Sequence, residues 1–205
     1  MTVLAWSGAV GAVLFVVVFT VDGLTRPDYR PTYHTVSALS LGLRGRVQVG
    51  NFVVSGALIA IGSLGTAVGS TSVSGLLGSV TVGIAGLGLI ASGVWSMEPM
   101  RDYPAGAETP AKVGRAHLRH DNAGAVVFAA LPLAPFIWAW HLWNFDAVGL
   151  AVYSVFTGIV AVAASGRFAV AWENDHPRTG AIQRLMLVVV CAWIVVVYVH
   201  VGLGA

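Results

Sequence analysis

The 23 residues VSGLLGSVTVGIAGLGLIASGVW, at positions 73–95, contain no charged side chain. An apolar helix of about 20 residues spans the roughly 30 Å hydrocarbon core of a bilayer. A segment with this much glycine forms a poor helix in water, whereas in lipid the glycines allow helix backbones to approach closely. We therefore predict a membrane-spanning helix that packs through Gly75, Gly78, Gly86 and Gly93.

Five further apolar segments accompany this one. The chain of 205 residues is 57% hydrophobic and only 10% charged, whereas a soluble domain carries about a quarter charged residues. The first segment is too long for the core of a signal peptide, so we interpret it as a retained helix. The sequence predicts an all-α polytopic membrane bundle of six transmembrane helices in one membrane domain over residues 1–205. The predicted spans are 3–21, 47–68, 73–95, 123–142, 147–166 and 183–203.

The connections between the spans predict an orientation. Three are long (22–46, 96–122 and 167–182), and two are short (about 69–72 and 143–146). With six spans, the three long loops share one side of the membrane and both termini share the other. All 11 lysines and arginines fall in or beside the long loops. Because basic residues near span ends are retained in the cytoplasm, we expect cytoplasmic long loops and external termini.

Histidines and carboxylates gather in the same loops, although orientation requires neither. The segment GRAHLRHDNAG, residues 114–124, is expected to lie on a helix that runs into the fourth span. His117, His120 and Asp121 then share one face of that helix. Together with His34 of the first loop, they form a candidate four-ligand site for a divalent metal such as zinc.

Two other interpretations of this segment stay open. The spacing lacks the H-E-x-x-H metalloenzyme pattern, so His117 and Asp121 can equally form a structural hydrogen-bonded pair. The basic residues can instead contact anionic lipid headgroups. The candidate residues for binding a substrate or a headgroup are Arg101, Arg119, Arg184, Ser37, Gln48 and Asn51.

Gln48 and Asn51 lie three residues apart at the start of the second span. An amide at bilayer depth needs a hydrogen-bond partner, so both side chains are predicted to face the bundle interior. There they either join two helices or line a polar cavity. The single cysteine, Cys191, lies in an apolar run, so no internal disulfide and no thiolate metal site is expected.

Several segments together resemble a family of small bacterial membrane proteins, domain of unknown function 998. They are YHTVSALSLG, GRVQVGNF, MRDYP, GRAHLRHDNAG and GAIQRL ahead of a last span that carries a tryptophan. The resemblance implies about six spans in a bacterial inner membrane, and no agreed activity. The usual aspartate–proline pair is here Asp102-Tyr103-Pro104, which leaves the place of Asp102 open. The family-like positions are His34, Ser37, Gln48, Asn51, Asp102, Pro104, Gly114, His117, Gln183 and Arg184.

The favoured functional hypothesis is an enzyme that acts on a membrane lipid or a prenyl substrate at the cytoplasmic interface. Its candidate catalytic residues are Glu98, Asp102, His117 and Asp121. A metal could activate water for hydrolysis, or a carboxylic acid could protonate a prenyl chain and start a cyclisation or isomerisation.

The alternative hypothesis is a non-catalytic membrane protein that binds lipid headgroups, senses a signal or serves as a partner subunit. A transporter ranks below both, because the spans hold almost no ionisable residue. A haem protein with axial His141 and His200 is a further possibility, but nothing around these two histidines supports it. No nucleic-acid partner is expected.

Overall fold

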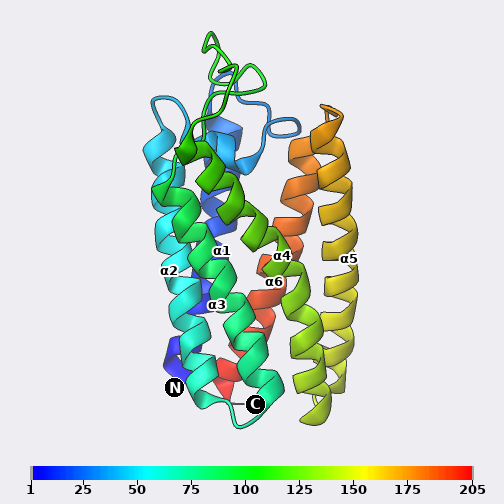
Figure 1. The fold of residues 1–205 in the computed structure, drawn as a ribbon. Coiled ribbons are helices and arrows are strands. Elements are labelled where there is room, and N and C mark those ends of the chain that lie inside the picture. Colours follow the sequence, from blue (N-terminus) through cyan, green and yellow to red (C-terminus); the bar gives the residue numbers. More distant parts are fainter. Residues whose placement is uncertain (1, 205) are drawn as a thin grey trace.

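The computed structural model describes residues 2–204, and within them six long helices account for most of the chain (Figure 1). All six are long and apolar enough to cross a membrane. The short 3₁₀ helix η1, Val36–Ser40, lies in the first long loop. These elements confirm the predicted all-α class with six candidate spans. The helices are α1 (Thr2–Thr25), α2 (Gly45–Gly69), α3 (Val73–Val94), α4 (Arg115–Asn144), α5 (Val148–Glu173) and α6 (Thr179–Leu203).

The helices contain the predicted spans to within one residue, and several extend further at the end where the long loops lie. α4 begins at Arg115, well before the predicted span at 123, and α5 continues to Glu173, well past 166. Apolar composition marks only the part of a helix that lies in hydrocarbon. The backbone hydrogen bonds of a helix can continue into the polar region, where composition gives no boundary.

Consecutive helices pack side by side around the bundle, and α6 returns to contact α1. Aromatic side chains fill the interior between them, and two of these side chains form hydrogen bonds across helices. Trp193 donates to the Ser154 hydroxyl at 2.8 Å, and the hydroxyls of Tyr198 and Ser63 lie 2.8 Å apart. Such pairing stabilises the bundle because the bilayer offers no water to a buried polar group, although the indole N–H of Trp138 is buried without a partner among residues 2–204.

The glycines of α3 bring it into backbone contact with α2. A Cβ on Gly86 would lie 2.8 Å from the Gly56 carbonyl oxygen and 2.9 Å from the Ala60 nitrogen. At Gly93 it would lie 3.1 Å from the Val49 carbonyl oxygen. These distances leave no space for a side chain, so the predicted packing role of these glycines is confirmed.

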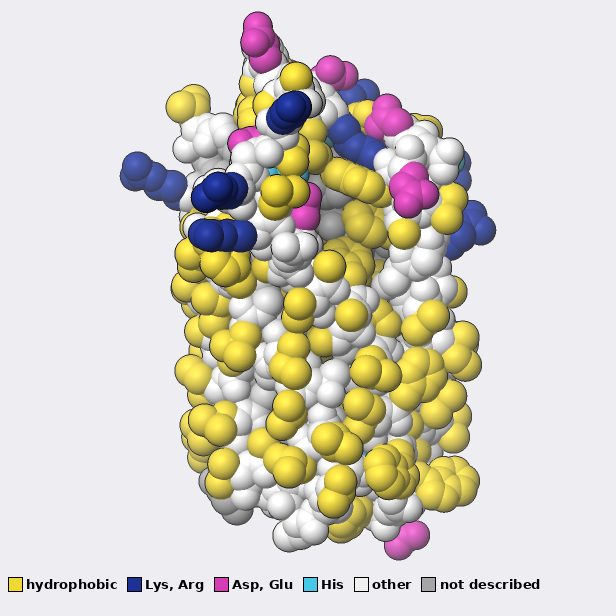
Figure 2. All heavy atoms as spheres, in the orientation of Figure 1, with side chains coloured by type: hydrophobic (Ala, Val, Ile, Leu, Met, Phe, Trp, Pro, Cys, Tyr) yellow, Lys and Arg dark blue, Asp and Glu magenta, His cyan; other side chains and the backbone are white. Residues whose placement is uncertain are grey.

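The three long connections meet at one end of the bundle, and both short turns lie at the other (Figure 1). Figure 2 shows that lysine and arginine side chains gather at the loop end, while apolar side chains cover the wall below it. The loops therefore share one end, as the sequence predicts. The loop-end connections span residues 26–44, 95–114 and 174–178.

Candidate functional site

A buried carboxylate at the end of α1 anchors the loop end. Asp22 is only 2% exposed, and its oxygens lie 2.5 Å from the Arg26 guanidinium and 2.6 Å from that of Arg44. Arg26 also donates to the Leu41 carbonyl at 2.7 Å and to the Tyr103 hydroxyl at 3.2 Å. This cluster ties α1 to the first and second long loops. None of these residues was among the predicted site residues, although an aspartate four residues before an arginine is a recognisable helical pair.

Arg184, at the start of α6, holds the first long loop. Its guanidinium donates to the carbonyls of Pro31 at 2.6 Å and His34 at 2.9 Å, and to the Tyr29 hydroxyl. Burial raises the pKa of Tyr29 to about 12, although the charge of Arg184 opposes the change. The donors of Arg184 thus bind groups of the protein itself. The sequence had instead predicted that Arg184 contacts a substrate or a lipid headgroup.

Arg101 of the middle loop is committed in the same way. It donates to the Trp172 carbonyl at 2.6 Å and to the Thr179 hydroxyl at 3.3 Å, and it lies 3.2 Å from the Asp175 carboxylate. Its guanidinium also lies over the Trp172 ring, 4.2 Å from the centroid. Arg101 therefore joins the middle loop to the α5–α6 connection.

Both ring nitrogens of His34 are occupied. Nδ1 accepts from the Arg30 backbone N–H at 2.9 Å, and Nε2 lies 3.1 Å from the Arg101 carbonyl oxygen, to which it can only donate. Burial lowers the pKa of His34, and the charges of Arg30, Arg101 and Arg184 lower it further, while the bond to the Arg101 carbonyl opposes them. His34 is thus a neutral link between two loops.

His117 has a similar structural arrangement at the start of α4. Its Nδ1 accepts from the Glu98 backbone N–H at 3.1 Å, and its Nε2 lies 3.3 Å from the Asp121 carboxylate. The Glu98 side chain accepts the Gly114 N–H with both oxygens, at 3.0 and 3.1 Å. Two of the four predicted catalytic residues, Glu98 and His117, therefore hold α4 against the middle loop, while a third, Asp121, pairs with His117 on the same helix. The fourth, Asp102, is exposed on that loop.

His120 differs from the other two histidines. Its Nδ1 lies 2.9 Å from the Ser92 carbonyl oxygen and 3.0 Å from that of Trp95, at the C-terminal end of α3. Carbonyl oxygens only accept hydrogen bonds, so Nδ1 carries a proton. Within residues 2–204, Nε2 has no hydrogen-bond partner. The ring is therefore fixed in one tautomer with Nε2 available.

The predicted four-ligand metal set is not assembled. Among the described residues 2–204, no three His, Cys, Asp or Glu side chains are arranged to hold a metal ion. The reason is visible at His34 and His117, whose ring nitrogens point at backbone groups or a carboxylate. His117, His120 and Asp121 are therefore close together on α4, but their side chains do not converge on one metal ion.

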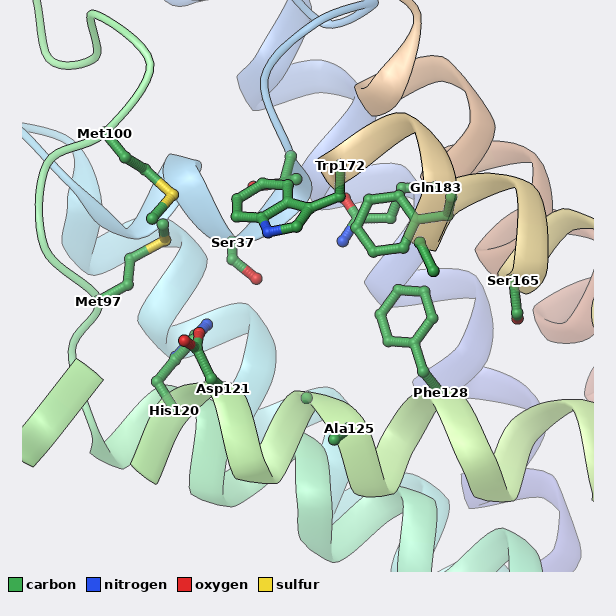
Figure 3. A pocket seen from close by; sticks show the side chains of 14 residues that line it. Ser37, Met97, Met100, His120, Asp121, Ala125, Phe128, Ser165, Trp172 and Gln183 are labelled. Atoms are coloured by element: carbon green, nitrogen blue, oxygen red, sulfur yellow. The ribbon is translucent and has the colours of Figure 1, made fainter. Parts of the chain in front are cut away.

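A cavity of about 390 Å³ opens beside His120, between α4, α5 and the middle loop (Figure 3). Figure 3 shows His120, Asp121 and Phe128 rising from α4 toward the side of the cavity where Ser37 and Trp172 lie. The rings of Phe128 and Phe168 stack with centroids 5.0 Å apart. The lining residues are Thr35, Ser37, Met97, Met100, His120, Asp121, Gly124, Ala125, Phe128, Ser165, Phe168, Ala169, Trp172 and Gln183.

The cavity collects only part of the predicted site. Ser37, His120 and Asp121 line it, whereas Gln48 and Asn51 do not. Asn51 donates to the Phe15 carbonyl at 3.1 Å and to the Gln48 side-chain oxygen at 3.3 Å. The two amides therefore face the interior, as predicted, and serve the contact between α2 and α1. Arg119 lies outside the cavity, on the opposite side of α4.

The apolar lining of the cavity was not predicted from the sequence. Met97, Met100, Phe128 and Phe168 come from a loop and two helices that are far apart in the chain. Their only sequence signal is aromatic and sulfur-containing side chains near the loop end of the spans, which also suits ordinary interfacial anchors.

The six apolar helices and the polar loop end define a multi-pass membrane protein. The chain belongs to the family described as "Protein of unknown function (DUF998)", whose model matches residues 9–200. The match extends into all six helices and confirms the resemblance found in the sequence. Comparison with curated proteins and with solved structures found no match.

Proposed function

We propose that the protein is an enzyme that acts on the polar end of a membrane lipid or isoprenoid, whose chain enters the cavity between α4 and α5. The observation that carries this proposal is the state of His120. Its Nδ1 donates toward two carbonyls, and its Nε2 has no hydrogen-bond partner in the described part of the chain, residues 2–204, and lies beside an apolar cavity.

The lining of the cavity suits an amphipathic ligand. Small-molecule sites are typically about 300–1,000 Å³, mostly apolar, with a few polar groups that fix orientation. Here Phe128, Phe168 and Trp172 supply an aromatic wall, and His120 and Asp121 supply polarity at the α4 side. At about 390 Å³ the cavity accommodates a polar end and part of a chain. The hollow lies where the apolar wall meets the charged end (Figure 2). At that level a lipid in the surrounding bilayer would reach it.

The geometry favours acid–base chemistry over metal-assisted hydrolysis. A positioned histidine that exchanges a proton with a reacting group contributes typically 10²–10⁴-fold to a rate. Nδ1 of His120 keeps its proton in either state, so Nε2 is the atom that accepts or returns one. Asp121, also at the cavity, is the nearest carboxylate along the chain. The other predicted catalytic groups, Glu98 and His117, are committed to holding α4.

The structural role of Glu98 and His117 favours a second candidate function, that of a non-catalytic lipid-binding protein. Glu98 and His117 fix the roof of the cavity rather than reaching into it. In this case the cavity holds the ligand, and His120 contributes a hydrogen bond rather than a proton transfer.

We infer from the arginine and lysine distribution that the loop end faces the cytoplasm. Labelling Ala107→Cys in a Cys191→Ala background tests the orientation. We expect a membrane-impermeant maleimide to label Cys at position 107 in broken cells but not in intact ones. Equal labelling of intact cells would reverse the orientation.

His120→Asn tests the enzymatic proposal, because the asparagine amide can still donate toward the Ser92 and Trp95 carbonyls while Nε2 is lost. The wild-type protein and the variant are incubated in nanodiscs with a lipid extract from the host membrane. We expect the wild type to convert one lipid or prenyl species and the variant to do so roughly 10²–10⁴-fold more slowly. The readout is lipid mass spectrometry.

His176→Asn is the matched control, since His176 is exposed in the α5–α6 connection. It should retain wild-type conversion. Equal conversion by His120→Asn and the wild type would overturn the catalytic role of His120. If the wild type retains a lipid but converts none, the lipid-binding candidate replaces the enzyme.

A further inference from the structure

We propose that an anionic phospholipid binds a second site, an outward-facing groove between α3 and α4, with its phosphate at Arg119. The groove has a volume of about 470 Å³ and shares no lining residue with the cavity beside His120. Its wall consists of Ile84, Leu87 and Ala91 of α3 and Ala123 and Val126 of α4. This site is independent of the proposed enzymatic function.

The floor of the groove is closed by direct contact between the two helices. A Cβ on Gly88 would lie 2.7 Å from the Val127 side chain and 3.2 Å from the Ala123 carbonyl oxygen. From Trp95 down to Ile84 the groove follows 11 residues of chain, or roughly 16 Å along a helix axis. This length matches the roughly 15 Å hydrocarbon depth of one leaflet. The groove therefore has the length and apolar character to hold one acyl chain.

The loop end of the groove carries a cation whose donors are free. Arg119 is exposed, its guanidinium lies 5.7 Å from the centroid of the Trp95 ring, and it forms no hydrogen bond or ion pair within residues 2–204. Arg101 and Arg184, in contrast, donate to the carbonyls of Trp172 and Pro31.

Two neighbours on the same face of α4 add to this polar end. Asn122 lines the groove beside Arg119, and Arg115 lies one turn before it. Residues three and four apart on a helix share a face. Asp121, the nearest carboxylate along the chain, lines the cavity and not the groove.

These features select an anionic phospholipid rather than a neutral lipid. A basic side chain near the membrane surface attracts anionic lipid. Trp95 lines the groove beside Arg119, and tryptophan is favoured at the level of lipid headgroups. The phosphate then accepts from Arg119 and Asn122, while the chain lies along α3.

Native mass spectrometry of the delipidated full-length protein tests the site. Phosphatidylglycerol and phosphatidylcholine with identical chains are titrated separately. We expect the wild type to bind phosphatidylglycerol more tightly, and Arg119→Gln to weaken its binding by about fivefold while phosphatidylcholine is unaffected. Arg167→Gln, which removes another exposed arginine at the loop end, should leave both affinities unchanged.

A second variant tests the groove itself. Ala91→Trp fills the groove below the headgroup and should weaken binding of both lipids, while conversion at the cavity persists. Equal binding of the two lipids by the wild type would overturn the anionic site. An equal loss in Arg119→Gln and Arg167→Gln would indicate general surface charge, and unchanged binding by Ala91→Trp would overturn the groove as the chain site.

Discussion

Asp22→Asn is expected to lower the free energy of unfolding by about 3–5 kcal/mol. The change leaves the buried Arg26 guanidinium, 4% exposed, without the carboxylate 2.5 Å from it. Arg44 is half-exposed and can turn toward water, so most of the loss arises at Arg26. The measurement is thermal unfolding of the detergent-purified protein, followed by tryptophan fluorescence.

Two variants make this prediction specific. Asp146→Asn removes an exposed carboxylate at the opposite end and should change stability by no more than about 0.5 kcal/mol. The double variant Asp22→Leu, Arg26→Leu removes both charges and should recover much of the loss, because apolar replacement of a buried pair is often neutral. An Asp22→Asn protein as stable as the wild type would show that the cluster does not hold the loop end together.

Gly124→Phe is expected to close the cavity and expel its ligand. Gly124 lines the cavity, and a Cβ at this position meets no heavy atom within 4 Å. The phenyl group therefore occupies space that the ligand would use. Displacing about four methylenes of a chain, at about 0.8 kcal/mol each, corresponds to roughly a hundredfold loss of affinity.

The readout is the lipid that co-purifies with the protein, extracted and quantified by mass spectrometry. Gly149→Phe is the matched control, since Gly149 also lies on a helix with open space around its Cβ and lines no part of the cavity. Retention of the same lipid by Gly124→Phe and Gly149→Phe would place the ligand elsewhere.

The fold followed from the sequence because the bilayer imposes a simple rule on length and polarity. Each uncharged run, such as 73–95, had to become a helix, since lipid leaves no other way to satisfy the backbone. The arrangement of loops at one end followed from counting spans. Helix ends were less predictable, because α4 continues to Arg115 through polar sequence where hydrophobicity gives no signal.

The candidate site could be predicted from the sequence only in part. Its chemistry depends on hydrogen bonds to backbone groups of other elements, and the sequence does not show where those groups lie. His117 and His120 lie three residues apart on one helix and have similar local sequence. One accepts a hydrogen bond from the Glu98 N–H, while the other donates to carbonyls at the end of α3. This difference decides which ring nitrogen is available, and it arises from tertiary contacts.

The contacts of the arginines could not be predicted from the sequence either. Sequence marks Arg101 and Arg184 as cations near the membrane surface, which suits phosphate binding. The structure pairs Arg184 with the carbonyls of Pro31 and His34, about 150 positions away in the chain. A guanidinium whose donors bind backbone carbonyls holds a loop in place and is not free to bind a ligand. The presence of arginines near the membrane surface therefore does not by itself identify a ligand site.

The most direct test of the central claim is photo-crosslinking in native membranes. A membrane lipid or isoprenoid that carries a diazirine in its chain is irradiated with the protein, and labelled peptides are mapped by mass spectrometry. We expect labelling to be concentrated at the cavity, at Phe128 of α4 and Phe168 of α5, and to be lost in Gly124→Phe but not in Gly149→Phe. Labelling spread evenly over the lipid-facing wall, and equal in both variants, would contradict it.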